Sequence, residues 1–161
     1  MAADSGIGDL LLTEGGQRRQ DSVRAALGLL PPDADMVCVH DAARPLCPPA
    51  VFDAVVSAAT RCGAATAAVP LVDSVKRVVD GMVVETLDRS ALLAVQTPQA
   101  FARVVLVEAH ASALVNGVAA DDDCALVEHL GRPVAVVPGD PANAKITVPS
   151  ALRLLGLRLP P

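Results

Sequence analysis

The sequence predicts an α/β fold with three layers and a mainly parallel sheet. Short apolar stretches alternate with segments of helical periodicity through the first 70 residues, in the order strand, helix, strand, helix, strand. Short links between such elements imply a sheet that helices cover on both faces. The stretch Met36–Val39 supports this, because it has no polar alternation and is expected to be buried on both faces, as parallel strands are.

Each element of this alternation has a local signal. The expected elements are a strand at 10–13, a helix at 21–30, a strand at 36–40, a helix at 49–61 and a strand at 65–69. Pro31 and Pro32 end the first helix, whereas Pro48 and Pro49 begin the second, which Gly63 ends.

The next segment breaks the alternation. Residues 74–79 and 82–87 are β-prone runs, and Asp80-Gly81 between them is a strong hairpin signal, since a type I′ turn needs positive φ at both central residues. Such a hairpin cannot bury both of its faces alone. We therefore expect an arm at about residues 72–91 that projects from a single domain, residues 1–161, and packs against a second copy of the chain.

Beyond the arm, the sequence indicates a loop, two helices, a strand and a terminal helix. These are expected at 96–99, at 102–114, after 121–123, at 133–137 and at 150–157. Asp121-Asp122-Asp123 is interpreted as an N-cap and first-turn acidic cluster rather than a metal site, because carboxylates there complement the helix dipole. His110 and His129 fall in helices and receive no role.

Composition excludes some classes of function. The chain has 13 Lys and Arg against 18 Asp and Glu, a formal net charge of −5, which argues against nonspecific binding to nucleic acid or anionic membranes. With no Trp or Tyr and only two Phe, it also lacks the stacking surfaces of single-strand binders.

The four cysteines show no C-x-x-C spacing. Cys38, Cys47, Cys62 and Cys124 fall mostly in apolar segments, so we expect reduced cysteines in or near the core. The N-terminus has no basic leader pattern, and no apolar run approaches membrane-spanning length. A soluble, cytoplasmic protein is the expectation.

The stretch His40–Pro45, of sequence HDAARP, places a carboxylate and a guanidinium three residues apart directly after an apolar strand. In open α/β sheets, ligands bind beyond the carboxyl ends of strands. Asp41 is suited to hold Mg²⁺ with substrate phosphates completing its coordination, and Arg44 offers a planar fork to phosphate oxygens. An isolated pair of this kind is more often a solvated ion pair at a turn.

That interpretation changes when six blocks are taken together in order. The blocks are Gly15–Val23 (GGQRRQDSV), the HDAARP stretch, Val72–Lys76, Asp88-Arg89, Gln96–Gln99 (QTPQ) and Gly139–Thr147. Between about residues 9 and 156, the chain thereby resembles the 2-C-methyl-D-erythritol 4-phosphate cytidylyltransferase family.

The resemblance implies a Rossmann-like nucleotidyltransferase fold whose hairpin arm embraces its partner in a homodimer. Members of the family transfer CMP from CTP to the 4-phosphate of methylerythritol and release pyrophosphate, in non-mevalonate isoprene biosynthesis. In-line displacement at phosphorus needs positioning and positive charge rather than a protein nucleophile. Two alternatives stay open. One is a ribitol 5-phosphate cytidylyltransferase, although the small Ala43 favours methylerythritol, because the ribitol enzymes tend to carry a bulkier residue there. The other is a catalytically inactive binding or dimerisation module.

The resemblance also implies roles for single residues. Asp41 would bind Mg²⁺, and Arg44 and Lys145 would supply catalytic charge. Nucleotide binding would fall to Gly15, Gly16, Gln17, Ser22, Asp41 and Ala42, and sugar-phosphate binding to Arg44, Ser74, Arg89, Thr97 and Lys145, partly from the neighbouring subunit. Taken singly, the glycine pair also fits a plain tight turn, and Arg89 and Lys145 also fit solvated charges.

Three features depart from the family pattern. The family's glycine-rich loop, of the form P-A-A-G-x-G-x-R with a following lysine, does not occur in these 161 residues, so we expect an N-terminally truncated family chain with little turnover by itself. Gln17 stands where an acidic residue often follows the glycine pair. Asp121 stands where a threonine is common, which puts a negative charge near a substrate phosphate.

Overall fold

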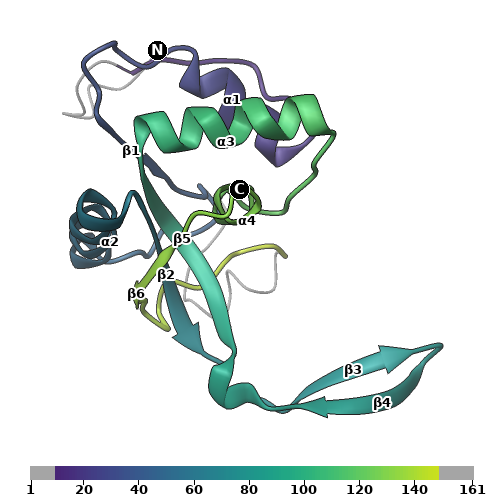
Figure 1. Cartoon of the computed structure of the whole chain (residues 1–161). Coiled ribbons are helices and arrows are strands. Elements are labelled where there is room, and N and C mark those ends of the chain that lie inside the picture. Colours follow the sequence, from purple (N-terminus) through teal and green to yellow (C-terminus); the bar gives the residue numbers. More distant parts are fainter. Residues whose placement is uncertain (1–9, 149–161) are drawn as a thin grey trace, which may run out of the picture.

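The computed structural model describes residues 10–148, and its centre is a four-stranded sheet (Figure 1). The strands, in their order across the sheet, are β1 (Met36–Val39), β5 (Leu93–Ala102), β2 (Ala64–Pro70) and β6 (Ala135–Pro138). β2 and β6 are parallel, whereas β5 runs antiparallel to both of its neighbours. The sheet is therefore mixed, with β1, β2 and β6 running in one direction and β5 in the other.

Helices cover both faces of this sheet. α2 (Pro49–Cys62) lies on one face, and α1 (Arg19–Leu27), α3 (Arg103–Asn116) and α4 (Asp123–His129) lie on the other (Figure 1). The expected α/β class and its three layers are confirmed. α2 has the boundaries that its prolines and Gly63 predict, because Gly63 ends it in the left-handed region at φ 87°.

Two cores result, one on each side of the sheet. Successive residues of β5 point to opposite faces, so Phe101 packs beneath α3 and α4 while Ala100 packs against α2. Phe101 and Leu106 of α3 are fully buried in the first core, and Val55 of α2 is fully buried in the second.

β5 corrects the prediction of a loop at 96–99. These residues lie in the middle of the strand and are all buried. Gln96 and Gln99 pair with β2, and the pairing with β1 begins at Gln99. Pro98 lacks an N–H to donate, and the pairing of β2 with β5 shifts register at this point, from Thr66–Gln99 to Ala67–Gln96. The irregularity accommodates the proline, which in the sequence alone resembles a loop signal.

Two further strand predictions were wrong in part. Residues 10–13 form no strand: Leu10 and Leu12 are exposed, and no described strand pairs with them. β1 exists but is not buried on both faces, because it is the edge of the described sheet, and Cys38 on it is exposed. The expected helix at 150–157 lies outside the described residues.

The cysteine prediction was also wrong in part. All four cysteines are free, but Cys38 and Cys62 are exposed and Cys47 is half-buried, so Cys124 alone belongs to the core. Within the described part of the chain, no helix is long and apolar enough to cross a membrane.

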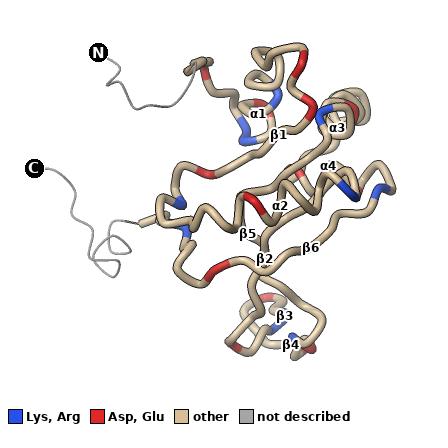
Figure 2. Tube along the Cα trace, turned by 90° about the vertical axis from the view of Figure 1, so that its left-hand side faces the viewer, with Lys and Arg blue, Asp and Glu red and all other residues tan. Residues whose placement is uncertain are grey.

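The hairpin is confirmed, formed by β3 (Val75–Val79) and β4 (Met82–Leu87). Asp80 and Gly81 both have positive φ, 48° and 77°, as a type I′ turn requires. The two strands extend away from the rest of the molecule, and they lie apart from the sheet in a second view as well (Figures 1 and 2). Apolar side chains along the arm are exposed, namely Val78, Val79, Met82, Val83 and Val84.

The fully buried ring of Phe101 should contribute strongly to the stability of the fold. Phe101→Ala should lower the free energy of unfolding by about 3–5 kcal/mol, because it removes apolar contacts and leaves a cavity in a close-packed core. Val104→Ala, at an exposed position of α3, is the control and should change that free energy by less than about 0.5 kcal/mol. Urea unfolding followed by circular dichroism measures both, and equal effects of the two substitutions would contradict the described core.

Candidate active site

A small polar pocket of about 110 Å³ lies where β1 and β5 end their pairing. Its charged side chains come from four separate parts of the chain: Arg19 at the start of α1, Asp41 and Arg44 after β1, Asp121 and Asp122 before α4, and Lys145 after β6. Thr97, Gln96 and Gln99 line it from β5. The sequence alone joined the HDAARP, QTPQ and Lys145 blocks by resemblance, and the fold brings them into contact.

Hydrogen bonds fix the HDAARP loop onto β5. The backbone N–H of Asp41 donates to Thr97 Oγ1 at 2.9 Å, and His40 Nδ1 lies 3.1 Å from the same hydroxyl. His40 Nε2 lies 3.0 Å from the carbonyl oxygen of Arg44, and its ring packs against that of Phe52 at 4.9 Å between centroids. His40 thereby closes the loop on itself and orients the residues that flank it.

Asp41 is held between two cations. Lys145 Nζ lies 2.7 Å from Oδ2, and Arg19 Nε lies 3.3 Å from Oδ1. Partial burial acts to raise the pKa of the Asp41 carboxyl, but the hydrogen bond from Lys145 and the charges of Arg19 and Lys145 outweigh it, so the pKa lies below its ordinary value. The carboxylate is therefore ionised at neutral pH.

The segment that carries Lys145 is tied to β5 by buried amides. Asn143 is fully buried and donates to the Thr97 carbonyl oxygen at 2.8 Å, while Gln96 Nε2 donates to the Asp140 carbonyl oxygen at 3.0 Å. A Cβ on Gly139 would overlap Gln96 Oε1 and lie 3.2 Å from a backbone oxygen, so a larger residue there would displace the Gln96 amide. These contacts place Lys145 over Asp41.

Arg44 points into the same region. Its Nη1 donates to the Asn143 carbonyl oxygen at 2.7 Å, and its buried Nε has no hydrogen-bond partner among the described residues. The guanidinium is thus fixed at one end and has a donor to spare, a geometry suited to an anionic ligand.

The glycine pair lies at the entry to α1. The backbone N–H of Gly16 donates to Ser22 Oγ at 2.9 Å, and a Cβ on Gly16 would overlap Cβ of Asp21. The close approach requires glycine at this position. Gly15 and Gln17 are exposed beside it, as is Ala42 in the HDAARP loop.

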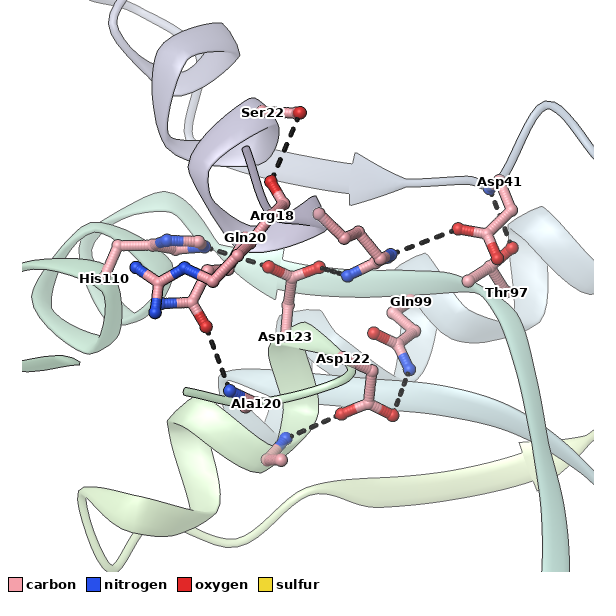
Figure 3. Close-up of polar contacts among 12 residues, drawn as sticks. Arg18, Gln20, Ser22, Asp41, Thr97, Gln99, His110, Ala120, Asp122 and Asp123 are labelled. Carbon is pink, nitrogen blue, oxygen red and sulfur yellow. Dashed lines mark hydrogen bonds and ion pairs between the residues drawn. The ribbon is translucent and has the colours of Figure 1, made fainter. Parts of the chain in front are cut away.

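The sequence missed a buried ion-pair network behind the pocket (Figure 3). Asp123, expected in an acidic first turn, is fully buried between Arg19 Nη1 at 2.6 Å and His110 Nε2 at 2.9 Å. Asp122 is the N-cap of α4, accepting from the Ala125 N–H at 2.8 Å. Periodicity gave no sign of the network, since His110 resembles an ordinary helix residue.

Known proteins resemble this chain in sequence and in structure. The sequence matches the profile of the 2-C-methyl-D-erythritol 4-phosphate cytidylyltransferases over residues 4–157. The chain belongs to this family. A cytidylyltransferase of that name from Pelotomaculum thermopropionicum is 51% identical over 142 residues, which are 88% of this chain and 60% of the relative. One from Syntrophotalea carbinolica is 47% identical over 144 residues, 89% of this chain and 62% of the relative.

Solved structures of the family share the fold. The crystal structure of the 2-C-methyl-D-erythritol 4-phosphate cytidylyltransferase from Thermus thermophilus aligns with a TM-score of 0.83 at 40% identity, covering 89% of this chain and 70% of that one. The Rossmann-like nucleotidyltransferase fold is therefore confirmed. This chain spans about 60% of the length of the two curated relatives above.

Ser74 and Arg89, which the family pattern assigns to the sugar phosphate, do not line the pocket of their own chain. Both are exposed at the base of the arm, before β3 and after β4. A larger cavity near that base, about 590 Å³, is lined by apolar side chains including Pro70, Val72 and Leu93. It offers no charged group to a phosphate.

The donor set limits how a cytidylyltransferase metal could bind here. The described residues contain no group of three or more His, Cys, Asp or Glu side chains arranged around a metal position. Asp41 supplies one carboxylate at the pocket, and Mg²⁺ in such sites takes one or two carboxylates together with substrate phosphates and water. The residues thus fit a metal shared with a nucleotide rather than one held by the protein alone.

The pKa of Asp41, and with it the stability of the protein at acidic pH, should depend on the two ion pairs. Lys145→Met should raise the pKa of the Asp41 carboxyl, because it removes the nearer of the two cations. In the native protein, the lowered pKa contributes stability that is fully present above the unfolded value, about 3.9, and is lost as the pH falls through the folded pKa. The variant should lose less of its stability across that acidic window.

Carboxyl-carbon NMR titration of Asp41 measures this pKa directly. Lys76→Met, on the exposed arm, is the matched control and should leave the pKa of Asp41 unchanged, since Lys76 bonds to Thr86 at 2.7 Å. An Asp41 pKa that is the same with and without Lys145 would contradict the described ion pair.

Proposed function

We propose that this chain serves in the transfer of CMP from CTP to 2-C-methyl-D-erythritol 4-phosphate, with release of pyrophosphate. The observation that carries the proposal is the meeting of Asp41, Arg44, Thr97 and Lys145 at one pocket, from segments far apart in the sequence. Membership of the family and the names of the relatives support the substrates.

In the proposed reaction, an oxygen of the 4-phosphate attacks the α-phosphorus of CTP. A new phosphorus–oxygen bond forms while the bond from that phosphorus to pyrophosphate breaks, and the negative charge leaves with pyrophosphate. The protein needs to hold the reactants in line and to offset charge, and it needs no nucleophile. Arg44, with its free Nε, and Lys145, at the rim of the pocket, are the residues we assign to that task.

The nucleotide is proposed to lie along the entry to α1. Gly15, Gly16, Gln17 and Ser22 would meet its base and ribose, and Ala42 would adjoin them. Exposed backbone at the glycine pair supports this, because a ligand can approach it closely. Thr97 would contribute to the sugar-phosphate side, where its hydroxyl already contacts the Asp41 backbone.

We propose Asp41 as the ligand of a Mg²⁺ ion that also binds the phosphates. When bound, the ion supplies positive charge to the phosphate oxygens. For Asp41 to act in this way, one of its two oxygens would be released by Lys145 or Arg19, and Lys145 is the more exposed of the two cations.

We further propose that the arm packs against a second copy in a homodimer. Five exposed apolar side chains on a two-stranded arm favour burial by a partner, since each exposed Å² of apolar surface costs about 25 cal/mol. The apolar cavity at the base of the arm is a surface of matching chemistry. Ser74 and Arg89 would then reach the partner's pocket. Free cysteines support a reducing compartment, and we expect the cytoplasm.

Pyrophosphate release tests the activity. It is measured with CTP, methylerythritol 4-phosphate and Mg²⁺, on the 161-residue chain and on a chimera that carries a family glycine-rich loop ahead of it. In the chimera, Arg44→Met should lower the rate by about 10²-fold, because a preorganised charge on the phosphate is lost. Arg61→Met is the control and should have no effect, since Arg61 is exposed on α2 and its side chain bonds, among the described residues, to Ser57.

Calorimetric titration with methylerythritol 4-phosphate gives a second measurement on the 161-residue chain. The native chain should bind it more tightly than ribitol 5-phosphate, and Arg44→Met should weaken binding. A preference for ribitol 5-phosphate, or indifference to Arg44 in both measurements, would refute the assignment.

Replacing residues 75–87 by a short Gly-Ser turn tests the arm. Light scattering should give a dimer for the native chain and a monomer for the deletion, because the deletion removes the apolar surface that a partner would cover. Val104→Ser, at an exposed apolar position of α3 away from the arm, should remain dimeric. A deletion that stays dimeric would show that another surface holds the copies together.

A further inference from the structure

Arg19 connects the pocket to a buried acidic group behind it, Asp123. Its Nη1 lies 2.6 Å from Asp123 Oδ2, and its Nε lies 3.3 Å from Asp41 Oδ1. The guanidinium is planar, so fixing one nitrogen largely fixes the direction of the others. The position of Asp123 therefore determines where Arg19 presents its Nε.

Asp123 is itself firmly placed. Its side chain is 0% exposed, and His110 Nε2 lies 2.9 Å from its second oxygen, Oδ1. A buried carboxylate is costly unless it is paired and hydrogen-bonded, so both partners are needed to keep it in this position. Burial acts to lower the pKa of Arg19, but the charges of Asp123 and Asp41 outweigh it and raise that pKa, so Arg19 stays cationic.

The elements that carry these residues are joined next to the network. Gln20, the neighbour of Arg19, donates to the Val118 carbonyl oxygen at 3.1 Å and accepts from the Ala120 N–H at 2.9 Å. This clamp fixes the start of α1 to the segment before α4. Movement of Arg19 relative to Asp123 is thereby restricted by backbone contacts as well as by charge.

From this geometry we infer that Arg19 is a positioning residue, which the buried Asp123–His110 pair orients and which in turn fixes Asp41. With Oδ1 held by Arg19, the other oxygen of Asp41 and its partner Lys145 stay directed into the pocket. The inference adds Arg19, Asp123 and His110 to the machinery of the site. The inference rests on the proposed function only in the second test below, which uses methylerythritol 4-phosphate as the ligand.

The alternative is that Arg19 merely compensates the buried charge of Asp123, with its contact to Asp41 incidental. The two explanations differ in what happens at the Asp41 end when the far end of the network is changed. His110 does not line the polar pocket, so an effect of His110 on Arg19 Nε or on ligand affinity has to pass through Asp123 and Arg19.

The first test uses the ligand-free chain and NMR of arginine side chains. The Nε–H of Arg19 should exchange with solvent more slowly than that of Arg24, an exposed arginine on the same helix. Asp41→Asn and His110→Leu should both speed exchange at Arg19, and His110→Gln, which keeps a donor toward Asp123, should restore slow exchange. An exchange rate of the Arg19 Nε–H that is unchanged in both Asp41→Asn and His110→Leu would overturn the inference.

The second test is a double-mutant cycle on the affinity for methylerythritol 4-phosphate, measured by calorimetry. Arg19→Lys should weaken binding about tenfold, because a single ammonium cannot contact both carboxylates in two directions. In an Asp41→Asn background the same change should cost nothing further. Arg24→Lys should leave affinity unchanged.

If the double variant loses affinity by the product of the two single losses, Arg19 acts independently of Asp41 and has a structural role alone. The same conclusion follows if Arg19→Lys changes the free energy of unfolding and leaves the affinity unchanged. If Arg19→Lys does not fold, the His110→Leu and His110→Gln pair decides by the same affinity measurement. A native chain that fails to bind the sugar phosphate would refute the proposed function, and the exchange measurement would still decide the role of Arg19.

Discussion

Three polar side chains on the buried strand β5 hold the pocket together. A buried hydroxyl or amide costs free energy unless it finds a hydrogen-bond partner, and the partners of these side chains lie in three different loops. Thr97 binds the HDAARP loop, Gln96 binds the segment that leads to Lys145, and Gln99 donates to Asp122 at the start of α4 at 3.1 Å. These hydrogen bonds join three separate segments of the chain at the pocket.

The same strand connects the pocket to both cores. β5 contributes Phe101 to one core and Ala100 to the other, and it is paired on both sides. A shift of β5 would disturb two cores and two ladders together, so the polar residues that precede Ala100 on the strand are held by the packing of the whole domain. The charged side chains above them depend on these polar residues.

Local signals in the sequence predicted the elements that local chemistry specifies. α2 begins at prolines and ends at Gly63, and the Asp80-Gly81 turn defines the hairpin, because both rest on backbone preferences of a few residues. β5 could not be predicted in this way. Pro98 is a loop signal by composition, yet it lies inside β5, at the point where the pairing with β2 shifts register.

The site shows the same division. Asp41, Arg44, Thr97 and Lys145 were found by resemblance, because they fall in blocks that a sequence can display. Arg19, Asp123 and His110 were missed, since their partnership joins two helix starts and a helix interior that only the fold brings together. The prediction of a strand at 10–13 was wrong for a different reason. An apolar run forms a strand only when another strand pairs with it, and no described strand lies beside these residues.

The charged side chains that line the pocket balance one another. Its lining contains three cations, Arg19, Arg44 and Lys145, and three carboxylates, Asp41, Asp121 and Asp122, so the formal charges cancel. A triphosphate and a sugar phosphate bring several negative charges, which a neutral pocket cannot offset by itself. Asp121, exposed at the rim, adds a further negative charge that opposes the binding of anionic ligands. The balance therefore favours additional positive charge from outside the pocket, which is what the proposed Mg²⁺ at Asp41 and the proposed reach of Arg89 from a second copy would each supply.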